Sequence, residues 1–227
     1  MISRRLVVSA AGILVALALF VFLPSSNVLL LAQPAFVAHE YQQPWVPPAD
    51  RYDSATRLQL AQETVRWLTS GEDIAALRSL SHDGQAVYNE RELKHMADVK
   101  VVLNGLRWVW CLAGVILLGA LGVAIGQPVF RRPFAAGMFW GSALLVAALA
   151  GIVIGAILNF DAFFVLFHRV FFSGDSWLFA YEDSLIQFYP VEFWMDATWI
   201  LGGATLLEGL LVGGLTFLYR ARTRGKR

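Results

Sequence analysis

The chain has 227 residues, of which 57% are hydrophobic, and its formal net charge at pH 7 is +1. A positive mean hydropathy and several apolar runs near twenty residues long exclude an ordinary soluble domain and are typical of an integral membrane protein. The alternating pattern of a membrane-spanning barrel strand, about ten residues long, is absent from the sequence, which favours helices.

Four apolar runs are long enough to cross a hydrocarbon core of about 30 Å at about 1.5 Å per helical residue. The predicted spans are residues 1–32, 100–126, 134–158 and 197–219. The first has the basic start and apolar centre of a signal peptide, but its length and the three later spans indicate an uncleaved anchor. The predicted fold class is therefore all-α, a four-transmembrane-helix bundle.

The distribution of charge predicts the orientation of these spans. Basic residues without acidic neighbours occupy three short segments: residues 1–5, the turn 127–133 and the tail 220–227. Every carboxylate except Glu208 lies in the long loops 33–99 and 159–196. By the positive-inside rule, both termini are cytoplasmic and both long loops are extracytoplasmic. The basic tail is explained by this rule and implies no nucleic-acid partner.

The first long loop, residues 33–99, is predicted to form a small helical cap. Prolines and aromatic residues in 33–53 predict extended chain at the membrane surface. Apolar residues at helical spacing predict helices over 54–70 and 72–80, followed by a turn at 81–84. Helices this short are not stable alone, so their apolar sides must be buried against the membrane surface or the second loop.

A long helix is predicted to begin at Asn89 and to continue directly into the second span. Asn89 can cap this helix, and Glu92, three residues later, can bond back to it as in a capping box. Tyr88 and Leu93 occupy the two positions of a hydrophobic staple. His95 therefore lies on a well-specified helix close to the membrane surface.

Charges of both signs surround His95 on this helix. Arg91, His95 and Asp98 share one face, and Glu92 lies one turn back on a neighbouring stripe. Glu92 and Asp98 are candidates for orienting the imidazole, and simple solvation of both carboxylates is the alternative.

The second long loop, residues 159–196, is the most aromatic part of the sequence. Phenylalanines recur at spacings of three and four between 160 and 172, which predicts a helix that also carries His168. The turn that follows contains a Gly-Asp-Ser sequence, and we expect Ser176 to cap the next helix. A serine esterase of the GDS type is disfavoured because no histidine follows His168.

Two of the four histidines are candidates for chemistry. His39 and His82 are predicted to be surface residues, whereas His95 and His168 lie in loops that must pack over the same bundle. Two imidazoles at one interface suit acyl transfer, in which one accepts a proton and the other donates one. A zinc site is the competing interpretation, although the sequence contains no His-Glu-x-x-His pattern and no cysteine cluster.

Glu208 is the one carboxylate predicted to lie within a membrane span. Such a residue marks a proton or ion path, or it is protonated and bonded across helices to Ser142 or Thr205. Glycines at close spacing are expected to mark tight helix packing. They are Gly151, Gly155, Gly202, Gly203, Gly213 and Gly214.

Two stretches carry a resemblance to a known family. They are YNERELKHMADVK at residues 88–100, and FHRVFFSGDSWLF with DSLIQFYPVEFW within residues 167–194. Together with four spans and a cap, they resemble the bacterial lipoprotein intramolecular transacylase (Lit) family. The resemblance implies transfer of the sn-2 acyl chain of a diacylglyceryl-modified N-terminal cysteine to its α-amino group, which leaves a lyso-form lipoprotein. It implies a bacterial cell membrane location with the active site on the outer face.

By the same resemblance the catalytic residues are His95, from the Glu-x-x-His-Met piece, and His168, from the Phe-His piece. One acts as a base on the amine and the other as an acid toward the glycerol oxygen, and the assignment between them stays open. The predicted partners are the diacylglyceryl-cysteine lipoprotein and membrane lipid. The amide product is more stable than the ester, so no nucleotide is required. No metal or other cofactor is expected.

Further residues are expected to bind substrate or to support the histidines, partly as an aromatic wall that confines the substrate. They are Asn89, Arg91, Glu92, Asp98, Phe163, Phe167, Phe171, Trp177 and Asp183. Two other functions stay open from the sequence. One is a metal-dependent membrane lipid hydrolase that uses the same histidines, and the other is a non-enzymatic scaffold or small transporter that depends on Glu208.

Overall fold

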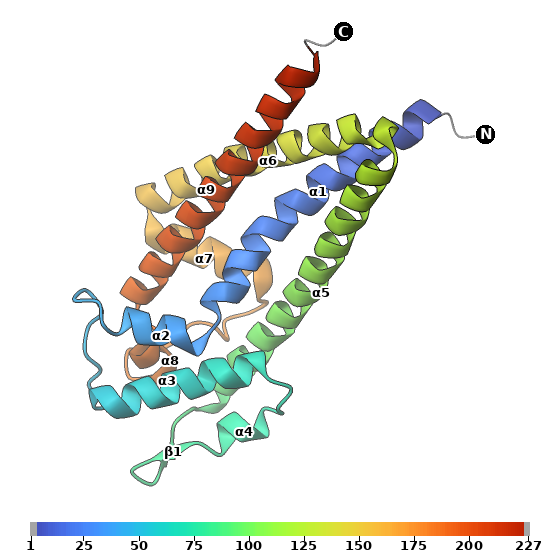
Figure 1. The fold of residues 1–227 in the computed structure, drawn as a ribbon. Coiled ribbons are helices and arrows are strands. Elements are labelled where there is room, and N and C mark those ends of the chain that lie inside the picture. The colour runs from blue at the N-terminus through green and yellow to red at the C-terminus, as the bar shows by residue number, and fades with distance from the viewer. Residues whose placement is uncertain (1–3, 225–227) are drawn as a thin grey trace. The chain divides into compact units, whose positions relative to one another are not determined.

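The structure is a computed structural model that describes residues 4–224 (Figure 1). The first residues of the predicted segment 1–32 and the last three of the basic tail 220–227 lie outside the described residues. The elements are α1 (Arg4–Leu31), α2 (Pro34–Glu40), α3 (Ser54–Thr69), α4 (Ala75–Arg78), β1 (Ser81–His82), β2 (Gln85–Ala86), α5 (Glu90–Gly126), α6 (Pro128–Leu158), α7 (Phe160–Phe171), α8 (Ser184–Phe188) and α9 (Val191–Arg224). The predicted all-helical class is correct apart from one two-residue hairpin.

Four of the described helices are long and apolar enough to cross a membrane, as the sequence predicted. They are Leu6–Leu31 within α1, all of α5, all of α6, and Val191–Thr223 within α9. The protein is therefore a multi-pass membrane protein. The turn expected over residues 127–133 is much shorter in the structure. Helix α5 ends at Gly126 and α6 begins at Pro128, so only Gln127 joins them. A proline is compatible with the first position of a helix, where no intrahelical N–H bond is needed.

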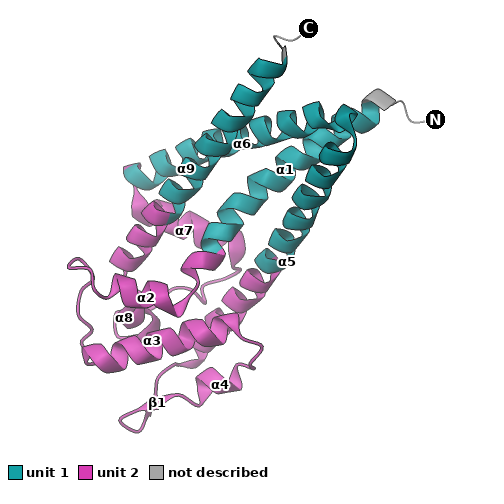
Figure 2. Ribbon diagram, in the orientation of Figure 1, with its two compact units in different colours: residues 1–28, 106–157, 201–227 teal, residues 29–105, 158–200 magenta. Residues whose placement is uncertain are grey.

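The chain divides into two compact units (Figure 2). Unit 1 contains residues 1–28, 106–157 and 201–227, and unit 2 contains residues 29–105 and 158–200. Unit 1 is made from α6 and from parts of α1, α5 and α9. Unit 2 contains the short helices, the hairpin and the remaining parts of α1, α5 and α9.

Small residues bring α1 and α6 close together in unit 1. A Cβ atom added to Gly137 would clash with the carbonyl oxygen of Gly12, and one added to Gly141 would lie 2.6 Å from the carbonyl oxygen of Ala16. The close packing predicted at Gly151 and Gly155 is wrong, because a Cβ at either position would meet no atom within 4 Å. The tight helix contact therefore lies 14 residues, about four turns, earlier in α6 than expected.

The remaining glycines expected at tight contacts give a mixed result. A Cβ added to Gly213 would lie 3.2 Å from Ser142 Cβ, and one added to Gly202 would lie 3.8 Å from Val153 Cγ2. At Gly203 and Gly214 it would meet no atom within 4 Å. Of the α9 glycines expected at tight contacts, only Gly213 is closely packed, and Gly209, which was not among them, would place a Cβ 3.2 Å from Val146 Cγ2.

Asn27 of α1 supplies the partner of Glu208. Its side-chain nitrogen donates to Thr205 Oγ1 at 3.0 Å and to Glu208 Oε2 at 2.9 Å. A bond across helices was expected for Glu208, but its donor is Asn27. Ser142 Oγ, the other expected partner, is buried and has no hydrogen-bond partner among the described residues. The Glu208 carboxyl is thus part of a polar contact between α1 and α9.

Unit 2 has a core of aromatic and aliphatic side chains. Phe188 of α8 is fully buried, and its ring contacts Tyr52 at 5.0 Å and Tyr88 at 6.1 Å between centroids. The α3 helix begins where predicted, with Asp53 Oδ1 accepting from the backbone N–H groups of Ala55 and Thr56. This core contains residues of both the first and the second long loop.

The prediction of extended chain throughout 33–53 is wrong, because residues 34–40 form α2. Pro34 occupies the first turn, where it does not interrupt helical bonding, and Val37 is buried in the core of unit 2. Glu40, the last residue of α2, is fully buried, and neither carboxyl oxygen has a hydrogen-bond partner among the described residues.

Two further local predictions differ from the structure. The helix expected over 72–80 is limited to α4, where Asp73 Oδ1 accepts from the N–H of Ala75. The turn expected at 81–84 is the tip of the β1–β2 hairpin, in which Asp83 and Gly84 both have positive φ, 50° and 74°. Two successive positive φ values are the requirement of a type I′ hairpin, which Asp-Gly satisfies.

Candidate active site

The start of α5 is held by the predicted capping box. The N–H of Asn89 donates to Glu92 Oε2 at 2.8 Å, and the N–H of Glu92 donates to Asn89 Oδ1 at 3.0 Å. Tyr88 and Leu93, the expected staple residues, are 4% and 2% exposed. The first turn of the helix that carries His95 is therefore fixed in direction.

Glu92 also joins α5 to α8. Its second oxygen, Oε1, accepts from the backbone N–H of Leu185 at 2.8 Å, and the side chain is 1% exposed. Asp183, the residue before α8, accepts from Asn89 Nδ2 at 2.8 Å and from Arg91 Nη2 at 2.9 Å. Through these bonds, the Glu92 and Asp183 carboxylates connect the second long loop to the first turn of α5, about one turn before His95.

His95 and His168 lie together in unit 2. His168 is on α7, whose start is capped by Asn159 Oδ1 accepting from the N–H of Ala162 at 2.9 Å. The two imidazole rings are stacked at an interplanar angle of 26° with 6.1 Å between centroids. His95 is buried, at 8% exposure, and His168 is partly buried. The loops thus bring together the two histidines that the sequence singled out.

Aromatic rings enclose the histidine pair. Phe172 contacts both, with centroids 4.9 Å from His95 and 5.7 Å from His168. Phe164 and Trp177 lie 4.2 and 4.9 Å from His168. Phe179 lies 5.3 Å from His95. Both imidazoles are therefore shielded from water on several sides.

Two of the four aromatic residues expected to confine the substrate lie against His168. Trp177 stacks on His168, and the Phe167 ring lies 5.6 Å from it. Phe163 and Phe171 have no ring contact with either histidine within residues 4–224, and Phe171 is 48% exposed. Their rings instead contact other phenylalanines of α7, Phe160 and Phe167.

Sequence reasoning missed the residues that enclose the histidines most closely: Phe164, Phe172 and Phe179. Phe164 and Phe172 lie four positions before and after His168, so helical spacing counted from the histidine itself identifies them. No sequence signal pairs Phe179 with His95, because that contact depends on how the second loop folds back.

The protonation of His168 follows from its neighbours. Its Nδ1 lies 2.8 Å from the carbonyl oxygen of Phe164, which can only accept, so Nδ1 carries the proton and Nε2 has a free lone pair. Burial lowers the pKa of His168 below its ordinary value, and the bond to Phe164 partly opposes this change. At neutral pH the ring is a neutral base.

His95 is placed differently from His168. Its Nδ1 is buried and has no hydrogen-bond partner among the described residues. Two positive charges at 6.1 Å would repel by about 3 kcal/mol at an effective dielectric constant of about 20. The two rings therefore do not carry positive charges at the same time, and one stays neutral when the other accepts a proton.

The expected charged orienters do not contact His95. Asp98 Oδ2 accepts from Lys94 Nζ at 3.0 Å, and both oxygens of Glu92 are used by backbone N–H groups. Arg91 lies over the Phe179 ring at 5.8 Å. The side chains packed directly against the His95 ring are therefore aromatic, and within residues 4–224 neither carboxylate forms a hydrogen bond with it.

The other candidates lie apart from this pair. His39 contacts the Phe36 ring, and His82 lies beside Asp83 and Tyr52. Ser176 does not cap a helix, because residues 174–177 form a turn and α8 begins at Ser184. Within residues 4–224, no group of three or more His, Cys, Asp or Glu side chains is arranged to hold a metal ion.

Comparisons with known proteins point to one family. Residues 11–194 match the family model described as lipoprotein intramolecular transacylase Lit. An uncharacterised protein of Aquifex aeolicus is 31% identical, over 94% of this chain and 98% of its own length. An in meso structure of the membrane integral Lit of Bacillus cereus superposes with a TM-score of 0.79 at 18% identity, and covers 99% of this chain and 100% of that chain. A second structure, of the same Bacillus protein with a histidine-to-arginine mutation, gives a TM-score of 0.59 at 19% identity, over 99% of this chain and 96% of that chain.

Proposed function

Because the chain belongs to the lipoprotein intramolecular transacylase family, and is thus an acyltransferase, we propose that it converts diacylated lipoproteins to the lyso form. In this reaction the α-amine of the N-terminal cysteine attacks the sn-2 ester of the glyceryl group carried by the same cysteine. A new amide C–N bond forms and the ester C–O bond breaks. The observation that carries the proposal is the stacked pair His95 and His168, 6.1 Å apart inside an aromatic enclosure.

His168 is assigned as the base. Its Nδ1 proton is held by the Phe164 carbonyl, so Nε2 is available to accept the proton that the amine loses on attack. When the C–O bond breaks, the imidazolium returns this proton to the glycerol oxygen. The proton balance is therefore closed within one turnover, and no external acid, base or nucleotide is needed.

His95 is assigned as the hydrogen-bond donor to the oxygen that becomes negatively charged. Its Nδ1 is buried and uncommitted, so an N–H of this ring is free for substrate. A donor fixed in a site of low polarity stabilises a developing oxyanion more strongly than water does. Its neutral state is favoured by the nearby imidazolium that His168 becomes during attack.

The aromatic rings hold the substrate in a reactive shape. Both reacting groups belong to one molecule, so the enzyme gains most by holding the amine against the ester carbonyl. Phe172 lies against both imidazoles and is the side chain best placed to limit the conformations available there. Exclusion of water by these rings also protects the ester from hydrolysis.

The site is assigned to the outer face of the bacterial cell membrane. The basic residues of the 127–133 segment and the tail, together with the acidic long loops, support cytoplasmic termini under the positive-inside rule. A lipoprotein that carries a diacylglyceryl group is anchored at that face, with its N-terminal amine at the lipid headgroup level.

The test is coexpression of the protein with a diacylated lipoprotein, followed by mass spectrometry of the N-terminal peptide. Wild type is expected to give N-acyl, mono-O-acyl peptide, and His95→Asn and His168→Asn are expected to reduce the rate by about 10² to 10⁴ each. His39→Asn and His82→Asn are matched controls and should retain activity. An unchanged acylation pattern with wild type would remove the transacylase function, whereas full activity in both site variants would remove only the residue assignment.

A further inference from the structure

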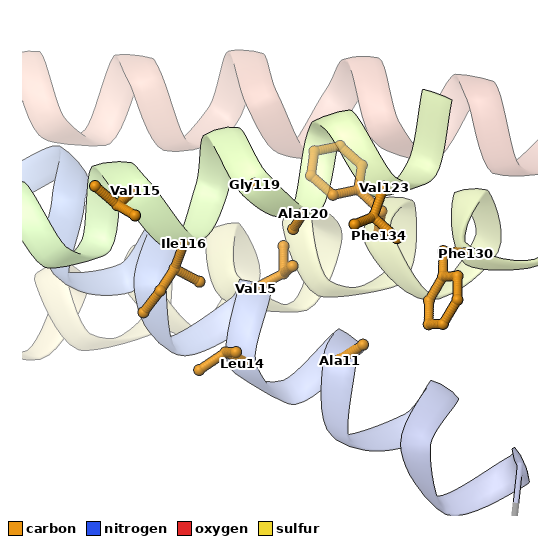
Figure 3. A pocket seen from close by; sticks show the side chains of 10 residues that line it. All are labelled: Ala11, Leu14, Val15, Val115, Ile116, Gly119, Ala120, Val123, Phe130 and Phe134. Carbon is orange, nitrogen blue, oxygen red and sulfur yellow. The ribbon is translucent and has the colours of Figure 1, made fainter. Parts of the chain in front are cut away.

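Unit 1 contains an apolar groove between α1, α5 and α6 (Figure 3). Its volume is about 370 Å³, within the range of small-molecule sites. Ala11 and Leu14 of α1 line one wall, Ile116 of α5 lines the second, and the rings of Phe130 and Phe134 of α6 lie at one end. No charged side chain is among its lining residues.

The surroundings of the groove restrict what can occupy it. All three helices that form it are long and apolar enough to cross a membrane, so the medium outside is lipid hydrocarbon. A polar metabolite or a peptide would have to leave water to enter. An acyl chain enters with no such loss and fills the groove with methylene contacts.

The depth of the groove depends on Gly119 of α5. Gly119 lines the groove, and a Cβ atom built on it meets no other atom within 4 Å. The position that a side chain at residue 119 would occupy is therefore empty, because no neighbouring helix fills it. Gly122, three residues later on the same helix, has equally open surroundings but does not line the groove.

Arg131 is the positively charged residue next to Phe130, at the end of the groove where Phe130 and Phe134 lie. Arg131 follows Phe130, and its Nε and Nη2 donate to the carbonyl oxygens of Ala124 and Ile125 at 3.1 and 3.2 Å. These carbonyls belong to the last turn of α5, directly after the groove residue Val123. An arginine has five N–H donors, so further N–H groups of Arg131 are left to bind an anion.

An apolar groove with an arginine at one end fits an anionic lipid, which has an apolar acyl chain and a negatively charged phosphate. We infer that the groove binds an acyl chain of an anionic glycerophospholipid, with the phosphate of that lipid bound by Arg131. The inference depends on unit 1 alone and is independent of the transacylase reaction.

The acyl-chain part is tested by native mass spectrometry of the full-length protein with phosphatidylglycerol and phosphatidylcholine in equal amounts. Wild type is expected to retain one phosphatidylglycerol in preference to phosphatidylcholine. In the series Gly119→Ala, Val and Leu, retention should fall with side-chain size, by about tenfold for Leu, as expected from excluding about two buried methylenes. Gly122→Leu is the matched control and should bind as wild type does.

The headgroup part is tested with Arg131→Gln against Arg132→Gln. Arg132 lies two positions from both Phe130 and Phe134, so it is on the opposite face of α6 and its loss should leave lipid binding unchanged. Arg131→Gln should abolish the preference for phosphatidylglycerol. Thermal unfolding of each variant identifies any that is misfolded, and the small Gly119→Ala change keeps the test informative in that case.

Specific outcomes overturn the inference. Equal retention by wild type and Gly119→Leu, or equal loss in Gly119→Leu and Gly122→Leu, removes the groove as the binding site. Equal binding of the two lipids by wild type, or equal effects of Arg131→Gln and Arg132→Gln, removes the phosphate contact.

Discussion

His168 Nδ1 lies 2.8 Å from the carbonyl oxygen of Phe164, one helical turn earlier on α7, and this contact selects the tautomer of the ring. The sequence placed His168 on a helix but left open which histidine acts as the base. The selected tautomer leaves Nε2 unprotonated, whereas His95 Nδ1 has no hydrogen-bond partner among the described residues. The two rings are therefore not equivalent.

The reaction rate should depend on pH through the pKa of His168, which burial lowers. Burial lowers the pKa of His168 below 6.5, so the neutral base persists at pH 6.5 and is lost only when the pH falls through the lowered pKa. Initial rates on a diacylated lipopeptide between pH 4.5 and 8 should show an acidic limb below pH 6.5. Trp177→Ala exposes the ring to water, raises the pKa of His168 and should move this limb to higher pH. The α-amine of the substrate, with a pKa of about 7.7–8.0, gives its own limb at higher pH, so the result that contradicts the prediction is a lower limb that Trp177→Ala does not move.

Phe172 and Phe171 form an adjacent pair with different expected effects. Phe172 contacts both imidazoles, whereas Phe171 is 48% exposed and contacts Phe167. Phe172→Ala should lower kcat/KM by about tenfold or more, because a misplacement near 1 Å costs up to about 10² in rate. Phe171→Ala should change it much less. Equal losses in the two variants would show that Phe172 has no special role at the histidines.

Glu92 should matter more for stability than the ion pair beside it. In Glu92→Gln an amide N–H₂ replaces a buried oxygen that accepts from a backbone N–H, which should cost about 1–3 kcal/mol. Arg91→Ala removes a partly exposed ion pair with Asp183 and should cost no more than about 1 kcal/mol. Thermal unfolding in detergent gives the order, and a larger loss for Arg91→Ala would be inconsistent with a structural carboxylate at 92.

Glu40 should make stability depend on pH. Burial first, and then the nearby Asp196 carboxylate, raise the pKa of Glu40 from 4.5 to about 7. Between about pH 4.5 and 7 the unfolded chain ionises this group while the folded chain keeps it protonated, so stability is lost as pH rises. Glu40→Gln should therefore raise the melting temperature at pH 8 and leave it unchanged at pH 4.5. The exposed Glu182→Gln is the control, and an equal shift in both variants would rule out burial as the cause.

Two glycines of α6 should respond differently to a methyl group. Gly137→Ala places a Cβ against the carbonyl oxygen of Gly12 and forces α1 and α6 apart, at a cost of about 1–3 kcal/mol. Gly151→Ala meets open space and gains helix propensity, so its melting temperature should equal or exceed that of wild type. A stable Gly137→Ala variant would mean that the two helices are not in tight contact.

Most of the local structure could be predicted because short-range rules determine it. Apolar run length identified the four membrane-spanning helices, and the capping box of Asn89 and Glu92 located the start of α5. The spacing of aromatic residues likewise predicted α7. The failures occurred where burial overrides local signals, as in α2, where the proline-rich composition suggested extended chain but Val37 is packed in a core.

By itself, the sequence determined that this is a four-span helical membrane protein and that His95 and His168 are its two histidines of interest. Only the tertiary structure decided that these rings stack 6.1 Å apart, that Phe172 and Phe179 enclose them, and that Asp183 accepts from Asn89 and Arg91. The reason is physical: hydropathy and helix caps act over a few residues along one chain segment. Contacts between a helix and a loop distant in sequence depend on how complete side chains fill the space between them.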